Sequence, residues 1–303
     1  MRAEAQIAGK LAKLGGACVL SVCAAASAAV AGSVTQPGET VGIGAGAPLP
    51  EGLYFVDTGD WGVRTTSPRS ELGVNIPVVA WSTPWTLLGG RFEVVGAVPE
   101  LEAGTFGGVG TGSYNASMYN PALLGFLAWN LGGGFNFSYA LGGYFDVDAP
   151  LAWSSGSLNQ RFALTYNANG WDLTANAIWG IQFDQTTSSP QVSPCPAPFA
   201  TTGCNPNFVN LDLTATHTFG KWEFGAVGFG SWDVSTPIGT YARQSQFALG
   251  GLVGYNFGPV VLQAYLTTTV YEQNYGGNDT RFWARVIIPL WSPPAPPPIP
   301  TKG

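Results

Sequence analysis

Long stretches of this chain alternate apolar and polar side chains with a period of two, and this pattern most constrains the fold. A period of two places one set of side chains on each face of an extended strand. Residues 135–147 and 171–184 show it best, with aromatic or aliphatic side chains at nearly every second position. Past residue 31 there is no run of about 18 apolar residues, so membrane-spanning helices are not expected. The sequence therefore predicts an all-β fold.

The composition favours a membrane environment for these strands. Only 10% of the residues are charged, whereas soluble domains carry roughly a quarter. In hydrocarbon every backbone group needs an internal hydrogen-bond partner, and a closed β-barrel is the solution that remains when helices are excluded. A soluble β-sandwich or a lipocalin-like barrel shares several of these signals and is the alternative.

The first 31 residues have the organisation of a cleaved signal peptide. Basic residues precede a weakly apolar, Ala-rich stretch at 14–31, which ends in the small-residue motif Ala29-Val30-Ala31. We expect cleavage after Ala31. A retained N-terminal anchor is the alternative, but the stretch is poor in Leu, Ile and Phe. Lipid attachment at Cys23 is disfavoured by the bulky Val22 before it.

Cleavage removes three basic residues and one acidic residue, which leaves 9 basic and 17 acidic residues and a net charge of −8. Such a chain has no electrostatic footprint for nucleic acid. Cys195 and Cys204 remain, and in an oxidising compartment they predict a disulfide. Two cysteines and the distant His217 are too few ligands for zinc, and we expect no metal or other cofactor.

Turn signals divide the alternating pattern into strands. Asn169-Gly170 separates two alternating segments, and Asn-Gly supplies the positive φ angles of a tight hairpin. Further turns are expected near 82–84, 131–133, 219–221 and 257–259. The twelve expected strands are 52–62, 69–81, 86–98, 120–131, 133–147, 157–168, 170–184, 207–219, 221–234, 244–257, 259–272 and 280–290. Three of them alternate poorly, so counts of ten and fourteen remain open.

The connections between these strands alternate in length. Counted from the N-terminus, the even-numbered connections are all short, and the odd-numbered ones include the two longest, 99–119 and 185–206. Short periplasmic turns and long outer loops are typical of outer-membrane barrels. The prediction is a transmembrane antiparallel up-and-down β-barrel at residues 51–291, with twelve strands, in a bacterial outer membrane. Its expected partners are membrane lipid and the barrel-assembly machinery, to which Trp291 presents a terminal aromatic.

Aromatic residues near the expected strand ends indicate interfacial girdles, with buried core aromatics as the alternative. The girdle residues would be Trp81, Trp85, Trp129, Trp171, Trp222 and Trp291 on the periplasmic side, and Trp61, Tyr119, Trp153 and Trp232 on the outer side. Two segments flank the barrel. The Gly-rich segment 32–50 would fold into the lumen as a plug or hang in the periplasm, and 292–303 is a Pro-rich tail.

Several short motifs resemble a family of outer-membrane transporters named for the meta pathway of phenol degradation. They are Leu49-Pro50-Glu51-Gly52-Leu53-Tyr54, Ile76-Pro77-Val78-Val79-Ala80-Trp81, Gly112-Ser113-Tyr114-Asn115, and the hairpin from Phe162-Ala163-Leu164-Thr165-Tyr166 to Trp171-Asp172-Leu173. The resemblance spans most of residues 49–290 and implies movement of small hydrophobic or aromatic compounds, without transferring site residues. Fatty-acid transport barrels are looser relatives whose N-terminal hatch is longer than 32–50, which argues against a gated lateral exit here.

Alternation sends most charged strand residues into the lumen, because Arg at mid-depth on the lipid face would cost about 2–4 kcal/mol. The expected lumen and substrate-path residues are Arg91, Glu93, Tyr144, Arg161, Asp172, Tyr265, Tyr271, Trp283 and Arg285. We expect Arg91 and Glu93 to pair with Arg285 across the interior. A narrow lumen that mixes rings with a few charges suits small, partly apolar solutes. The alternative is that these groups only fill and cross-link a closed barrel.

These observations predict an outer-membrane channel for small hydrophobic or aromatic solutes, working by passive or facilitated diffusion. A structural or adhesive surface barrel with a closed lumen, acting through 99–119 and 185–206, is the alternative. Catalysis is not expected, because His217 is the only histidine and falls on the outer face with Leu211 and Leu213. No serine is placed beside it, as a hydrolytic triad would need.

Overall fold

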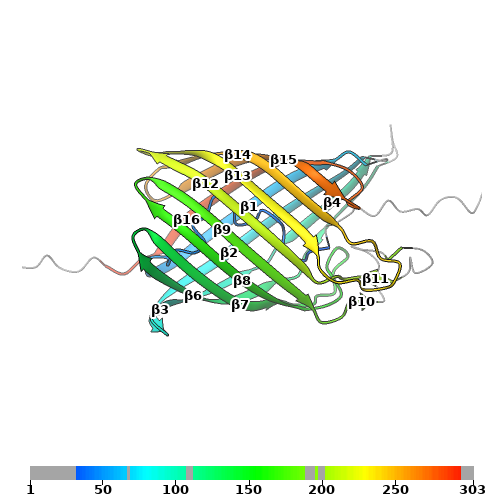
Figure 1. Ribbon diagram of the computed structural model, residues 1–303, viewed down its shortest axis with the longest axis horizontal. Helices are drawn as coiled ribbons and strands as arrows, with labels where there is room; N and C mark the ends of the chain where they lie inside the picture. Colours follow the sequence, from blue (N-terminus) through cyan, green and yellow to red (C-terminus); the bar gives the residue numbers. More distant parts are fainter. Residues whose placement is uncertain (1–31, 67–68, 107–111, 188–194, 197–201, 295–303) are drawn as a thin grey trace, which may run out of the picture.

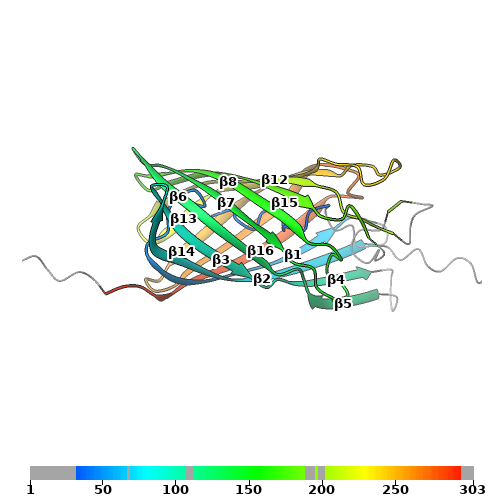
Figure 2. The ribbon, with the colours of Figure 1, turned by 90° about the horizontal axis from the view of Figure 1, so that it is seen from below.

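The computed structural model describes residues 32–66, 69–106, 112–187, 195–196 and 202–294. They form a β-barrel whose strands are strongly tilted against the long axis (Figures 1 and 2). The predicted signal peptide and most of the predicted Pro-rich tail lie outside these residues. Within the described ranges no helix is long and apolar enough to cross a membrane. The strands are β1 (Gly52–Arg64), β2 (Arg69–Leu87), β3 (Gly90–Ala97), β4 (Glu100–Phe106), β5 (Gly112–Met118), β6 (Ala122–Gly132), β7 (Phe135–Tyr144), β8 (Ser157–Ala168), β9 (Trp171–Gln182), β10 (Thr186–Thr187), β11 (Gly203–Cys204), β12 (Phe208–Phe219), β13 (Trp222–Asp233), β14 (Ser245–Asn256), β15 (Val261–Gln273) and β16 (Asp279–Trp291).

Two of the wall strands are interrupted. β2 pairs with β3 along one part of its length and with β4 along another, so β3 and β4 are successive parts of one wall strand. β6 and β5 pair with β3 and β4 in the same manner. Pro99 and Pro121 stand at the two breaks, where a residue without an N–H interrupts the ladder. The wall therefore has the predicted twelve strands, and antiparallel pairing of β1 with β16 closes it.

The hairpin of β4 and β5 extends the wall at the end that carries the long connections (Figure 2). The expectation of a loop throughout 99–119 is therefore wrong, because β4 stays paired with β2 from Arg69 to Asn75. Tyr114, Asn115 and Ala116 are exposed in succession on β5. Since neither face of β5 is buried there, no apolar alternation marks it in the sequence.

Short turns gather at the opposite end of the barrel. Asn169 and Gly170 have φ angles of 54° and 82°, which confirms the predicted tight hairpin between β8 and β9. The predicted turn at 82–84 is wrong, because β2 continues to Leu87 and turns at 88–89. The β2–β3 ladder is irregular around Pro84, and Thr83 Oγ1 donates a 2.7 Å hydrogen bond to a β3 carbonyl there.

The outer face of the wall is apolar, with aromatic rings near its ends. Trp81, Trp85 and Trp171 are exposed at the short-turn end, and Trp61 is exposed toward the other. Trp153 is only 1% exposed and does not belong to the expected outer girdle. The 145–156 connection folds inward instead, because the Asn120 amide donates to the Trp153 carbonyl at 2.9 Å and its Oδ1 accepts the Trp153 N–H at 2.7 Å. The neighbouring Tyr119, also expected in the girdle, is 5% exposed.

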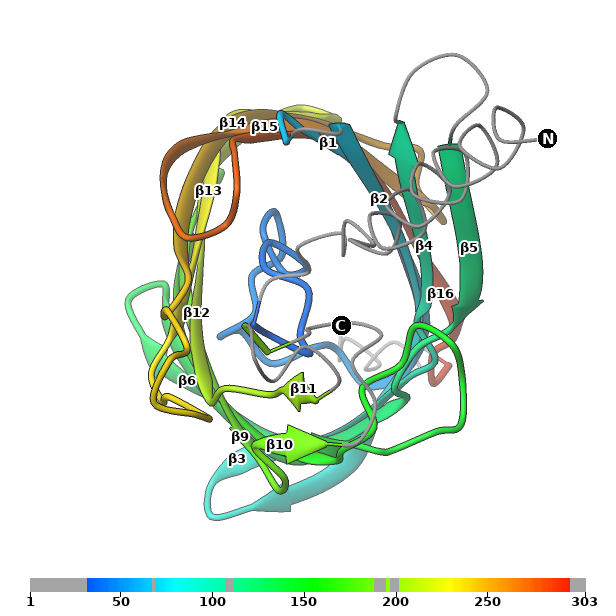
Figure 3. The same cartoon turned by 90° about the vertical axis from the view of Figure 1, so that its right-hand side faces the viewer.

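Residues 32–50, here called the lumen segment, lie inside the barrel. Figure 3 shows this segment in blue within the ring of strands. Its N-terminal part lies toward the long loops, since Ser33 and Thr35 contact Asn210 near the start of β12. Its other end leads directly into β1 at Gly52.

Candidate functional site

Asp212 of β12 is the centre of the contact between the lumen segment and the wall. One carboxylate oxygen accepts the Gly38 N–H at 2.8 Å, and the other accepts the Thr40 N–H at 3.0 Å and the Thr40 hydroxyl at 2.7 Å. Because the Thr40 hydroxyl donates to Asp212, its oxygen is free to accept the Asn176 amide at 2.9 Å. These four hydrogen bonds hold Gly38 and Thr40 of the segment against β9 and β12.

Two arginines of the wall hold the same stretch from other sides. Arg161 of β8 forms an ion pair with Glu39 at 2.7 Å. Arg285 of β16 donates to the backbone carbonyls of Glu39 at 2.7 Å and Val41 at 2.5 Å. Arg285 also donates to Gln263, whose amide in turn donates to Gly42 O. The expected pairing of Arg285 with Glu93 does not occur, because carbonyls of the lumen segment occupy this guanidinium.

Two threonines on the same side of the barrel also bind backbone groups of the lumen segment. Thr165 Oγ1 accepts the Gly46 N–H at 2.9 Å, and Thr214 Oγ1 accepts the Gly42 N–H at 2.7 Å. These anchoring side chains stand on β8, β9, β12, β15 and β16. The inner face of these strands is therefore the polar side of the lumen wall.

The other side of the lumen wall is apolar and borders a cavity of about 210 Å³. The cavity lies between the lumen segment and inward side chains of β1, β2, β3 and β6. Apolar lining residues are Tyr54, Val56, Ile76, Val78, Ala80, Val95, Ala97, Leu124 and Phe126. Glu39, Glu93, Ser138, Arg161 and Asn176 provide its polar margin. Apolar cavities of about 150 Å³ admit benzene, so one small ring fits here.

Leu49 closes the cavity toward the short-turn end. Its N–H donates to Glu93 Oε1 at 2.8 Å, and its carbonyl accepts the Ser82 hydroxyl at 2.9 Å. Arg91, the other predicted residue of β3, donates to the Thr83 carbonyl at 2.8 Å near the same end. Of the two β3 residues, only Glu93 reaches the lumen segment.

Buried rings close the lumen toward the long loops. Trp153, Tyr119 and Tyr144 belong to one buried cluster with Val34 of the lumen segment and Phe208. The predicted Tyr144 is 4% exposed, and its hydroxyl accepts a 3.3 Å hydrogen bond from Arg161. In the part of the chain that the structure describes, these buried side chains narrow the lumen toward the long loops.

The predicted aromatic path on β15 and β16 lies beneath the lumen segment. Tyr265 and Trp283 stack with centroids 5.1 Å apart, and Phe229 meets Trp283 edge-on at 5.9 Å. A Cβ at Gly38 would lie 2.6 Å from the Phe229 ring, so the segment covers these rings closely. The predicted Asp172 likewise faces the segment, because a Cβ at Gly44 would lie 2.8 Å from its carboxylate.

Tyr271 points out of the barrel, contrary to expectation. Phe247 of β14 pairs with Tyr271 and Ala248 pairs with Thr269, so Val270 is an extra residue in the ladder. A bulge of this kind shifts the side-chain alternation by one position. Tyr271 is accordingly 52% exposed, and its hydroxyl bonds to Gln273 on the outer surface.

The lumen also contains an ionic cluster near the long loops, and the sequence did not predict its pairing. Arg281 contacts Asp60 and lies 2.8 Å from Asp279, which is also 3.5 Å from Arg64. Gln36 of the lumen segment donates to Asp60 at 3.2 Å. Arg281 shares the inner face of β16 with Trp283 and Arg285 by the period of two, but no sequence signal indicates which acids of β1 and β16 it meets.

The predicted disulfide is present between Cys195 and Cys204. It belongs to the long connection between β9 and β12, next to the short pair β10–β11. His217 lies on the outer face of β12, where its ring contacts Trp171 at 4.8 Å and Phe219 at 4.4 Å. Its position is that of an interfacial aromatic side chain.

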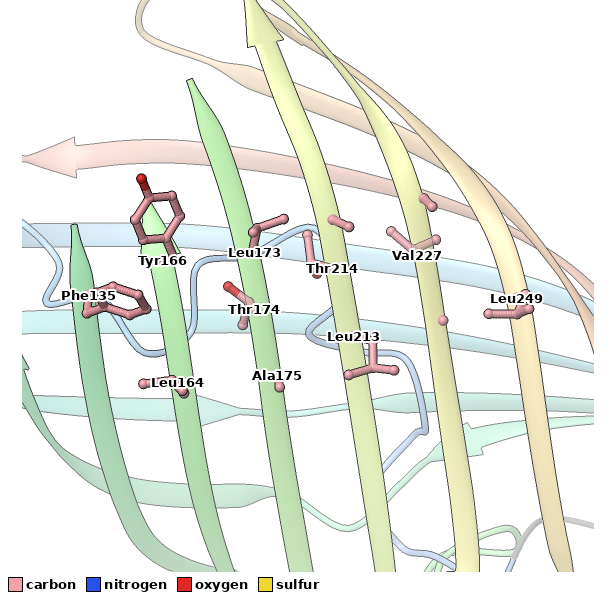
Figure 4. Close-up of a pocket in the computed structure, with 13 residues that line it drawn as sticks. Phe135, Leu164, Tyr166, Leu173, Thr174, Ala175, Leu213, Thr214, Val227 and Leu249 are labelled. Atoms are coloured by element: carbon pink, nitrogen blue, oxygen red, sulfur yellow. The ribbon is translucent and has the colours of Figure 1, made fainter. Parts of the chain in front are cut away.

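The outer surface also carries an apolar hollow over β8, β9, β12 and β13 (Figure 4). Phe135, Leu164 and Leu213 surround it, and the small side chain of Ala175 lies at its floor. This hollow is separated from the lumen by the wall, so it is not part of a passage through the barrel.

The closed wall, the apolar outer face and the aromatic rings near its ends define an outer-membrane β-barrel, with the short turns in the periplasm. The chain belongs to the family described as "Putative MetA-pathway of phenol degradation", whose model matches residues 51–286. No curated protein matches the sequence.

Two solved structures of low sequence identity are similar to this chain to different degrees. The COG4313 outer membrane channel from Pseudomonas putida F1 is similar with a TM-score of 0.59 and 12% identity, over 84% of this chain and 99% of that chain. The NanC porin is similar with a TM-score of 0.48 and 9% identity, over 78% of this chain and 100% of that chain.

Proposed function

We propose that this barrel lets small hydrophobic or aromatic solutes cross the bacterial outer membrane by passive or facilitated diffusion, along the apolar side of its lumen. The asymmetry of the lumen wall carries this proposal. The polar side binds the lumen segment through many hydrogen bonds, while the apolar side borders a cavity large enough for one small ring.

In this proposal the lumen segment acts as a plug that has to shift before a solute can pass. Leu49 borders the cavity toward the short-turn end and the Trp153 cluster lies toward the long loops, so a solute that crosses the barrel requires both to move. The segment is held by hydrogen bonds and one ion pair, and Val34 and Val41 add apolar contacts in two buried clusters. Polar contacts of this kind can exchange with water, which makes reversible displacement feasible.

Two measurements on the mature chain test the proposal. Single-channel conductance in a planar bilayer, with and without residues 32–50, reports whether the segment blocks the lumen. Uptake of phenol-like solutes into liposomes reports transport. We expect rare openings for the mature chain, steady conductance after truncation, and faster solute uptake than through an unrelated closed barrel. Equal uptake in both barrels would refute the transport proposal.

A structural or adhesive barrel is the second candidate, because the lumen segment and buried side chains occupy much of the lumen. It would act through the β4–β5 hairpin and the disulfide-bonded 183–207 connection. Replacing the 234–244 loop serves as a control. This candidate would be favoured if changes to the hairpin abolished surface binding and replacement of the 234–244 loop did not. It also requires that no variant conducts ions across a planar bilayer.

The predicted processing and assembly of the chain belong to the same proposal. Export would use residues 1–31 as a cleaved signal peptide, and the barrel-assembly machinery would recognise Trp291 at the end of β16. Mass spectrometry of the protein purified from outer membranes tests the cleavage.

A further inference from the structure

Gly32, the residue after the expected cleavage site, lies against Asp233 at the outer mouth of the lumen. A Cβ at Gly32 would overlap the Asp233 carboxylate and would lie 2.7 Å from Pro206 Cγ. Since a backbone nitrogen lies about 2.5 Å from its own Cβ position, the Gly32 nitrogen is within about 5 Å of Asp233 Oδ1. Glycine is the residue that this close approach requires.

The carboxylate of Asp233 is buried with incomplete pairing. Asp233 is 7% exposed, and its Oδ2 accepts the Tyr241 hydroxyl at 2.7 Å and the Gln244 N–H at 2.8 Å. Burial, followed by the charge of Asp233, raises the pKa of Tyr241, so this phenol stays a neutral donor. Within the described ranges no side-chain cation lies at ion-pair distance from Asp233, and the charge of Arg243 acts on this carboxylate only from farther away. A buried carboxylate without a cation is costly.

The neighbouring residues hold Gly32 in this position. Asn210 donates to the Ser33 hydroxyl at 2.9 Å and to the Thr35 carbonyl at 3.1 Å, and Asn159 donates to the Thr35 hydroxyl at 3.0 Å. Val34 is 2% exposed in the buried cluster of the mouth. The tip of the lumen segment therefore cannot slide along the wall without losing these contacts.

We infer that signal-peptide cleavage after Ala31 creates the missing cation, and that the new α-ammonium of Gly32 pairs with Asp233 and locks the tip of the lumen segment. Hydrolysis of the 31–32 peptide bond consumes one water and leaves a carboxylate on Ala31 and an amine on Gly32. With a reference pKa of about 7.7–8.0, this amine takes up a proton near neutral pH. In the uncleaved chain the same nitrogen is an uncharged amide.

The lock depends on the position of cleavage. One additional residue at the N-terminus would move the ammonium by about 3.3–3.6 Å and leave an amide beside Asp233. A chain that begins at Ala31 therefore cannot form the pair, although the rest of its lumen segment docks unchanged.

Amine labelling of the mature chain tests this inference directly. After cleavage the chain has three amines, the α-amine of Gly32 and the side chains of Lys221 and Lys302, which mass spectrometry resolves. Lys221 is exposed at a short turn and serves as the internal control. We expect a small amine-reactive reagent to modify Gly32 about tenfold more slowly in the folded chain than in urea, as for a pKa raised by one unit. The rate at Lys221 should change little.

Two variants identify the partner of the amine. Asp233→Asn should restore fast labelling of Gly32, whereas Asp148→Asn, which removes an exposed loop carboxylate, should not. A folded chain that begins at Ala31 should also label quickly. This chain keeps the test decisive if Asp233→Asn does not fold.

Two results would overturn the inference. One is a mature protein from outer membranes that does not begin at Gly32. The other is equal labelling of Gly32 in the folded and the urea-unfolded chain. Neither result depends on solute transport, so the lock and the proposed channel function stand or fall separately.

Discussion

Glu39 of the lumen segment and Arg161 of β8 form an ion pair of 2.7 Å, and each side chain is only 10% exposed. It is the single ion pair between the lumen segment and the wall within the described ranges. Around it, Asp212 and Arg285 bind backbone groups of the segment. The pair therefore helps to hold the segment in the lumen and takes no part in the hydrogen bonds between the strands of the wall.

Glu39→Gln should increase the frequency of channel openings without unfolding the barrel. Removing one partner of a buried pair leaves the other charge uncompensated, at a cost of about 3–5 kcal/mol. That cost weakens the docking of the segment and leaves the strand pairing unchanged. Single-channel recordings check it, with Asp148→Asn as the control for a lost surface charge. Unchanged opening frequency would mean that the pair does not hold the plug.

Arg285→Gln should raise the opening frequency of the mature chain but have little effect after deletion of residues 32–50. The guanidinium binds two carbonyls of the lumen segment, at 2.5 Å and 2.7 Å, so its role in closure needs the segment. A double-mutant cycle of conductance measures this coupling. Additive effects of the substitution and the deletion would show that Arg285 acts on the wall alone.

Ala97→Leu should slow the uptake of small apolar solutes by several-fold and leave the frequency of ion-conducting openings nearly unchanged. Ala97 borders the cavity, and a larger side chain there removes part of its volume. The matched control is Leu123→Ala, since Leu123 is 51% exposed on the outer face of the neighbouring strand. Liposome uptake assays compare the two. Equal uptake would exclude the cavity from the solute path.

Cys204→Ser should loosen the 183–207 connection and leave the barrel intact. The disulfide closes a short loop, for which about 2–3 kcal/mol of local stabilisation is expected. Limited proteolysis should therefore cut this connection faster in the variant, or after reduction of the native chain. The temperature at which the barrel unfolds in detergent should not change. A lower unfolding temperature would show that the connection also stabilises the wall.

Much of the wall could be predicted because its cause is local. The alternation in β7, β9 and β16 assigns each side chain to a face without reference to other strands, and Asn169-Gly170 specifies its hairpin by backbone conformation alone. The wrong assignments have identifiable causes. Tyr271 follows a bulge that depends on β14, and Trp153 turns inward because Asn120 binds its backbone.

The candidate site was predicted only in part. Arg161, Glu93 and Arg285 lie in the lumen as expected, but they contact Glu39, Leu49 and Val41 rather than one another. The period of two predicts the face of the strand on which a side chain lies, but it does not predict the group that the side chain contacts. No periodic signal marks the lumen segment, because many of its contacts are made by backbone groups.

The sequence by itself determined a closed membrane β-barrel with charges inside, rings at its ends and a Gly-rich segment before its first strand, and it favoured twelve strands over ten or fourteen. The tertiary structure alone decided where that segment lies, which side of the lumen is apolar, and that Gly32 of the segment lies against Asp233. The physical reason is the range of the interactions involved. Strand faces follow from neighbouring residues, whereas Gly38 and Asp212 are 174 positions apart and meet only when the barrel is closed.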